Sequence, residues 1–167
     1  MKTSALFFWY ILTQSLLAQS FELPEDGFFN PARDPVAHKV QDRLKLLFPE
    51  AVLVRAVAGQ FPRLGMVEKV ECQEIEGFWW LTIQSRHTDD LEQSIFVAVR
   101  LKPDGAGRYF ADTYWTACTG EACGGCDFKL QMDGCFCRFD KPGEPGIPGA
   151  CYQTSSDEML LIKVPLK

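Results

Sequence analysis

Seven cysteines are the residues of this chain with the most evident capacity for chemistry. Six of them fall between positions 118 and 151, while Cys72 lies far upstream. Thiolates bind soft metals, and pairs of thiols oxidise to disulfides. The segment that holds the six carries few apolar residues, so burial alone cannot offset the chain entropy lost when it folds. The sequence therefore predicts covalent or metal cross-links in this segment.

Disulfides are the favoured form of these cysteines, because dense cysteines in exported chains are usually oxidised. We expect three pairs among Cys72, Cys118, Cys123, Cys126, Cys135, Cys137 and Cys151. An odd total leaves one thiol over, and Cys72 is the candidate either for that thiol or for a bond from the cluster to the rest of the chain. Cys135 and Cys137 point the same way on an extended strand, which disfavours a bond between them.

A zinc site is the alternative use of four of these residues. The four thiolates are those of Cys123, Cys126, Cys135 and Cys137, and four sulfurs suffice for tetrahedral zinc. The first pair has the usual spacing of a zinc knuckle, whereas the second is one residue short. The expectation is therefore no cofactor, with zinc as the alternative.

An iron–sulfur cluster is a weaker alternative for the same region. The spacing Cys118-x4-Cys123-x2-Cys126 resembles the cluster-binding loop of plant-type ferredoxins, with Cys151 as a distant fourth ligand. That resemblance implies an electron-transfer role. Cys135 and Cys137 have no place in this scheme.

Residues 1–20 have the pattern of a secretory signal peptide. A lysine at position 2 precedes an apolar stretch too short to span a bilayer, and Ala18-Gln19-Ser20 resembles a cleavage site. We therefore expect a secreted protein, extracellular or periplasmic, with no membrane span in its later residues. The formal net charge of −5 argues against nucleic acid as a partner.

Patterns of apolar residues predict an α+β fold. Asp34 and Pro35 suit the start of a helix that ends near Phe48, with an apolar stripe of Val36, Val40, Leu44 and Leu47. Period-two segments predict strands at 51–58, 66–75, 78–85, 94–101 and 108–117, with a closing strand over 157–164. We expect one amphipathic helix packed on an antiparallel sheet of about four to six strands.

This outline divides the chain into three parts. Residues 1–20 form the signal peptide, residues 21–117 the helix-on-sheet core, and residues 118–167 a disulfide-braced segment with the closing strand of the same domain. Adjacent Trp79 and Trp80 point to opposite faces of a regular strand. One enters the core under the helix, and the favoured cover for the other is the cysteine-rich segment.

No catalytic residues can be named from the sequence. It lacks a G-x-S-x-G elbow and the glycine-rich phosphate loops. Candidate ligand-binding residues are Trp79, Trp80, His87, Tyr114 and Trp115. We expect a secreted, disulfide-stabilised binding protein whose partner is a protein or a small ligand. The alternatives are the metalloprotein and a small secreted hydrolase with an unrecognised site.

Overall fold

The computed structural model describes residues 23–61, 64–87, 94–121, 126–129, 132–137 and 150–167. Within these residues the protein is mostly β, with eleven strands and one short helix. The predicted signal peptide lies outside the described residues. In chain order the elements are β1 (Phe28–Phe29), β2 (Ala37–Val40), β3 (Arg43–Leu46), α1 (Glu50–Ala58), β4 (Leu64–Ile75), β5 (Phe78–His87), β6 (Ser94–Pro103), β7 (Arg108–Glu121), β8 (Cys126–Phe128), β9 (Cys135–Cys137), β10 (Ala150–Ser156) and β11 (Val164–Pro165).

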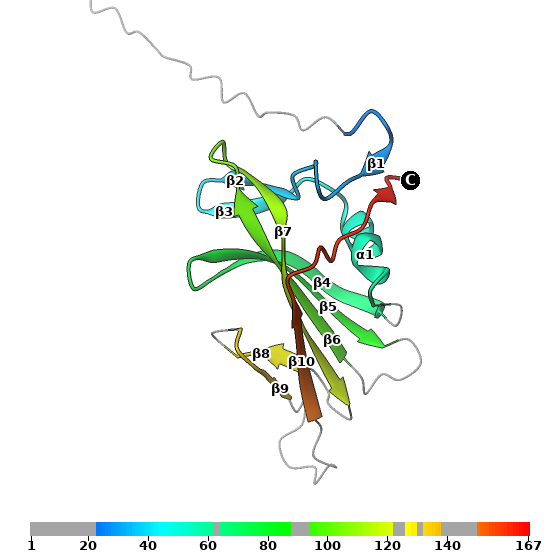
Figure 1. Cartoon of the computed structure of the whole chain (residues 1–167), viewed down its shortest axis with the longest axis vertical. Helices are drawn as coiled ribbons and strands as arrows, with labels where there is room; N and C mark the ends of the chain where they lie inside the picture. Colours follow the sequence, from blue (N-terminus) through cyan, green and yellow to red (C-terminus); the bar gives the residue numbers. More distant parts are fainter. Residues whose placement is uncertain (1–22, 62–63, 88–93, 122–125, 130–131, 138–149) are drawn as a thin grey trace, which may run out of the picture.

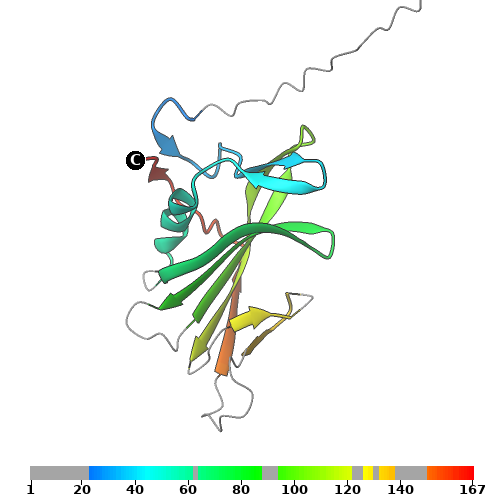
Figure 2. The ribbon, with the colours of Figure 1, turned by 180° about the vertical axis from the view of Figure 1, so that it is seen from behind.

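One strongly twisted antiparallel sheet dominates the molecule (Figure 1). Six of its strands follow the order β3-β2-β7-β6-β5-β4, and β10 pairs with the second half of β7. The sheet curls until β3 lies against β4, although no backbone ladder joins these two strands. Figure 2 shows the cyan β2–β3 hairpin above the green band of β4 at this nearly closed edge. We call the opening between β3 and β4 the seam.

The predicted α+β fold, with one amphipathic helix packed on the sheet, is therefore wrong. The helix expected from Asp34 to Phe48 is absent, and β2 and β3 form a hairpin in its place. A spacing of four residues keeps side chains on one face of a strand as well as of a helix. Residues 43–46 also alternate charged and apolar residues, which is the pattern of a half-buried strand. Gln41, with a φ of 57°, supplies the turn between the two strands.

The helix lies instead at Glu50–Ala58, where a strand was predicted. The valines there favoured a strand because β-branched residues are enriched in sheets. However, the buried side chains are Val52, Leu53, Ala56 and Val57, and their spacing describes one face of a helix. Pro49 precedes the first turn and accepts the backbone N–H of Val52 at 2.9 Å.

Four of the other predicted strands are present in the structure, and the closing strand is not. The strands predicted at 66–75, 78–85, 94–101 and 108–117 are confirmed as parts of β4, β5, β6 and β7. Glu76 and Gly77 have φ values of 53° and 78°, as a tight turn between β4 and β5 requires. The closing strand expected over 157–164 is wrong, because only β11 is extended there and it pairs with β1 rather than with the large sheet.

Apolar side chains cover the first face of the sheet. Leu81, Val97 and Val99 from the sheet pack in one cluster with Leu53 of α1 and Leu160 of the C-terminal segment. Figure 1 shows α1, β1 and the red C-terminal segment gathered at this side. We call these covering elements the helical layer.

The second face of the sheet is covered by β8, β9 and the residues around them. Trp80 and Ala98 of the sheet pack there against Met132, with Phe128 at their margin. Two disulfides, Cys118–Cys135 and Cys126–Cys151, join these elements to β7 and β10. We call β8, β9 and the two disulfides the cystine layer. Among the residues that the structure describes, no helix has the length and apolar character needed to cross a bilayer.

Candidate functional site

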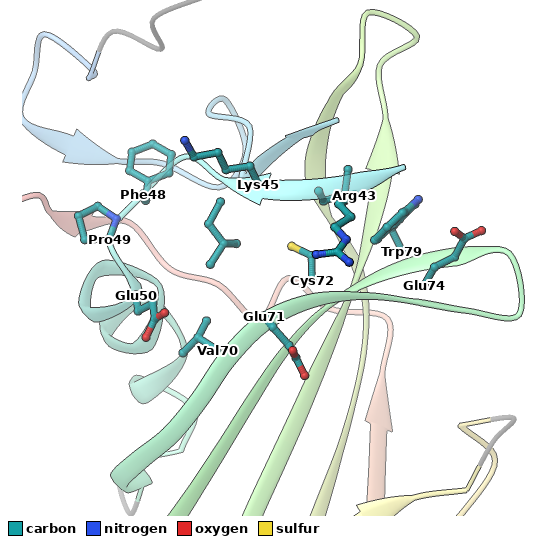
Figure 3. Close-up of a pocket in the computed structure, with 12 residues that line it drawn as sticks. Arg43, Lys45, Phe48, Pro49, Glu50, Val70, Glu71, Cys72, Glu74 and Trp79 are labelled. Carbon is teal, nitrogen blue, oxygen red and sulfur yellow. The ribbon is translucent and has the colours of Figure 1, made fainter. Parts of the chain in front are cut away.

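A cavity of about 730 Å³ occupies the seam. One wall is β3 with the link to α1, and the other is β4 with the start of β5 (Figure 3). Its apolar lining consists of Leu44, Leu46, Phe48, Pro49, Val70, Cys72 and Trp79. The volume lies within the range of about 300–1,000 Å³ that is usual for sites of small ligands.

The seam exists because the two strands beside it differ greatly in length. β4 has 12 residues, while β3 has 4 and ends at the turn that leads to Pro49. β4 pairs with β5 along one edge, and its other edge faces β3 without a ladder. A four-residue strand cannot cover a strand three times longer, so part of the apolar face near Val70 and Trp79 borders an opening.

Charged side chains frame this apolar lining. Arg43 extends from β3 toward β4 in Figure 3, and Trp79 lies between Arg43 and Glu74. The backbone of Arg43 pairs with that of Val40, but no hydrogen bond or ion pair joins the Arg43 side chain to any residue in the described part of the chain. Glu71 also borders the cavity, but its carboxylate points away from β3 and lies 2.6 Å from Lys69 Nζ. The cation of Arg43 is therefore available to a bound molecule.

Cys72 lines the cavity as a thiol, and it forms no disulfide. Of the two roles predicted for Cys72, the structure supports the leftover thiol. Burial, together with the nearby charge of Glu71, raises the pKa of this thiol to about 12. Reactive cysteines have the opposite character, because their thiolate is stabilised. Cys72 therefore contributes a small apolar surface to the cavity rather than a nucleophile.

A hydrolase that used Cys72 as its nucleophile would need a histidine beside it, and the fold keeps His87 away from this thiol. Cys72 stands opposite Leu81 on β5, and His87 ends the same strand six residues further on. Six residues of an extended strand span about 20 Å, far beyond the reach of a hydrogen bond. The side chain of His87 lies outside the described residues.

The aromatic residues proposed from the sequence divide between the two faces of the sheet. Trp79 lines the cavity, with its ring 6.2 Å from that of Tyr109. Trp115, on the same face, packs edge-on against Phe61 at 5.6 Å. Trp80 is 5% exposed and is buried beside Met132 of the cystine-rich segment, as was favoured from the sequence.

Tyr114 belongs to the second face, together with a group of charged residues. Its ring lies 5.9 Å from that of Trp80 and 5.0 Å from the Arg100 guanidinium. Arg100 and Lys102 each approach the buried carboxylate of Asp112 to 2.6 Å. Burial disfavours the charged form of Asp112, yet the hydrogen bonds from Lys102 and Arg100 outweigh it and lower the pKa of this carboxyl. Arg100, Lys102 and Asp112 are therefore paired with one another.

The disulfides occupy several of the residues proposed as metal ligands. Cys118, Cys126, Cys135 and Cys151 are oxidised in two pairs, and Cys123 lies outside the described residues. Cys137 Sγ lies 3.1 Å from Cys151 Sγ. A zinc or iron–sulfur site would need both pairs reduced. Two disulfides are thus observed among the seven cysteines, and the third pair expected from the sequence stays a prediction.

Comparison with known proteins returns no relative, since the chain matches no family model, no curated protein and no solved structure. Sequence reasoning found Trp79 and Cys72 but missed the β3 side of the cavity, above all Arg43 and Leu44. The signal was the alternation of charged and apolar residues in Arg43-Leu44-Lys45-Leu46, which indicates a strand with one face toward an apolar interior.

Proposed function

We propose that this protein is an exported, disulfide-stabilised binding protein that takes a small apolar molecule into the seam cavity. The observation that carries the proposal is the cavity itself, with a size suited to small ligands and walls that combine apolar with charged side chains. The pattern of residues 1–20 supports export, and the two disulfides are compatible with an oxidising compartment.

Apolar contact would supply most of the binding free energy. Leu44 and Leu46 of β3 are half-buried, and Trp79 presents a ring from the opposite wall. A ligand that fills the space between them would remove this apolar surface from water, at about 25 cal/mol per Å². Because the walls belong to paired strands, the site is largely formed before a ligand arrives.

The test is calorimetric titration of the whole protein with decanol, a neutral apolar probe. We expect saturable binding of one decanol per chain, accompanied by a change in tryptophan fluorescence because Trp79 lines the cavity. Leu44→Asn should weaken binding by about tenfold, because it places a polar amide in the apolar wall.

Val40→Asn is the matched control. Val40 lies in the same hairpin but is 47% exposed and does not line the cavity. This variant should bind decanol as the unmodified protein does. Absence of saturable binding in the unmodified protein, or an equal loss in the two variants, would contradict the proposal.

A further inference from the structure

We infer that the ligand of the seam cavity is an amphiphile with an anionic head group, and that Arg43 holds this head group. The inference rests on the proposed function and adds the charge of the ligand to it. Its starting point is the guanidinium of Arg43, which extends over the apolar opening without an ionic partner among the described residues.

Three other arginines of the described chain are paired with acidic residues, while Arg55 donates to the carbonyl oxygen of Pro165. Arg33 bonds to Asp26 and Asp34, Arg100 to Asp112, and Arg108 to Asp104. Each of these side chains is held by a carboxylate of the protein. Arg43 has no such carboxylate, although its side chain crosses the seam in Figure 3.

The acidic residues of the cavity do not fill this role. Glu71 is paired with Lys69, and its carboxylate is turned away from β3. Glu50 belongs to the first turn of α1, where the helix dipole favours a negative charge. Glu74 stands beyond Trp79 in Figure 3 and forms no ion pair with Arg43. A carboxylate supplied by the ligand would form the ion pair that the Arg43 guanidinium lacks.

The positions of the lining residues also indicate how a ligand would be oriented in the cavity. Arg43 and Trp79 mark one end of the cavity, whereas Phe48 and Lys45 lie toward α1 (Figure 3). A head group at Arg43 would leave an apolar tail along Leu44, Leu46 and Val70. A guanidinium binds a planar carboxylate through two parallel hydrogen bonds, which favours a carboxylic acid over an alcohol of equal length.

The test compares decanoate with decanol, which share one alkyl tail and differ in the head group. At pH 7 we expect the unmodified protein to bind decanoate about tenfold more tightly than decanol. Arg43→Gln should abolish this difference, because it removes the guanidinium that distinguishes the carboxylate of decanoate from the hydroxyl of decanol. Arg43→Lys should retain part of the preference, because it keeps the charge but loses the paired hydrogen bonds.

Lys45→Gln is the control for charge, since it removes a cation from the same strand at the other end of the cavity. It should keep the preference for decanoate. Equal affinities for the two probes in the unmodified protein, or loss of the preference in Lys45→Gln rather than in Arg43→Gln, would overturn the inference while the binding function stands. If neither probe binds, the proposed function itself fails.

Discussion

The two faces of the sheet are covered by different physical means. The helical layer buries large aliphatic and aromatic side chains, such as Phe29, Leu53 and Leu160, that are fully inaccessible to water. The cystine layer buries fewer apolar residues over Trp80 and Ala98 and carries both disulfides of the described chain. The short cystine layer has few apolar side chains to bury, so disulfides hold it in place. They stabilise the fold by restricting the unfolded chain.

The comparison also explains where an opening can persist. Disulfides tie β7 and β10 to β8 and β9 on the second face. On the first face the contact between β3 and β4 has neither a ladder nor a disulfide. The cavity therefore lies where the sheet is joined least firmly.

The largest effect is expected from truncating the apolar centre of the helical layer. Phe29 is 0% exposed, and its ring lies 4.6 Å from that of Phe48. Phe29→Ala should lower the free energy of unfolding by about 3–5 kcal/mol, since it leaves a cavity as well as losing burial. Urea unfolding, followed by circular dichroism, measures the loss.

Phe28→Ala is the neighbouring control. Phe28 is 39% exposed and contacts Lys163, with Nζ 4.6 Å from the ring centre. Its truncation should cost about 0.5–1 kcal/mol, the usual contribution of an exposed cation–π contact. Equal losses in the two variants would show that the helical layer does not depend on buried apolar packing.

Removing one disulfide should have the next largest effect. Cys118 and Cys135 close a loop with a sequence separation of 17. The double variant Cys118→Ala/Cys135→Ala should lose about 2–4 kcal/mol of unfolding free energy. Urea unfolding with and without reductant measures this loss, and reduction should remove more from the unmodified protein than from the double variant.

Cys72→Ala separates the cystine layer from the leftover thiol. Because Cys72 forms no disulfide, this variant should respond to reductant as the unmodified protein does. The loss of unfolding free energy in Phe29→Ala should likewise be the same with and without reductant. A reductant-dependent deficit in Phe29→Ala would mean that the two layers do not act independently.

The parts of the fold that the sequence predicted correctly depend on local chemistry. The cysteines from 118 to 151 indicated covalent bracing by their density alone, and period-two segments indicated parts of β4, β5, β6 and β7. Opposite faces for Trp79 and Trp80 followed from the alternation of side chains along β5. Each of these inferences needed a few neighbouring residues and no knowledge of the tertiary structure.

The helix was misplaced because two local signals pointed the wrong way. Asp34 and Pro35 suit a helix start, yet the Asp34 carboxylate accepts the backbone N–H of Asn30 at 2.7 Å and caps no helix. The valines of α1 favour a strand in isolation, and burial of one face decided the outcome. The seam required knowledge that β3 meets β4, which no local pattern carries.

A smaller effect is expected from the buried carboxylate on the second face. Asp112→Asn should cost about 1–3 kcal/mol at pH 7, because it weakens hydrogen bonds from Arg100 and Lys102. The pKa of Asp112 is lowered by folding, so its contribution is present above the unfolded pKa of about 4 and is lost as pH falls through the folded pKa.

Unfolding at pH 7 and pH 3 measures this contribution. The difference in stability between the unmodified protein and Asp112→Asn should shrink at pH 3. Asp157→Asn, at an exposed position, is the control and should cost less than about 0.5 kcal/mol. A difference that stays constant with pH would show that the Asp112 charge does not stabilise the fold.

The smallest effect is expected at Trp80, although this side chain is 5% exposed. Its Nε1 is buried without a hydrogen-bond partner among the described residues, so Trp80→Phe removes an unsatisfied donor together with part of an apolar ring. The gain from the first change offsets the loss from the second, and unfolding free energy should fall by less than about 1.5 kcal/mol. If the free energy of unfolding instead fell by more than about 3 kcal/mol, the cystine layer would depend on apolar packing as the helical layer does. The disulfides would then not compensate for one imperfectly filled position.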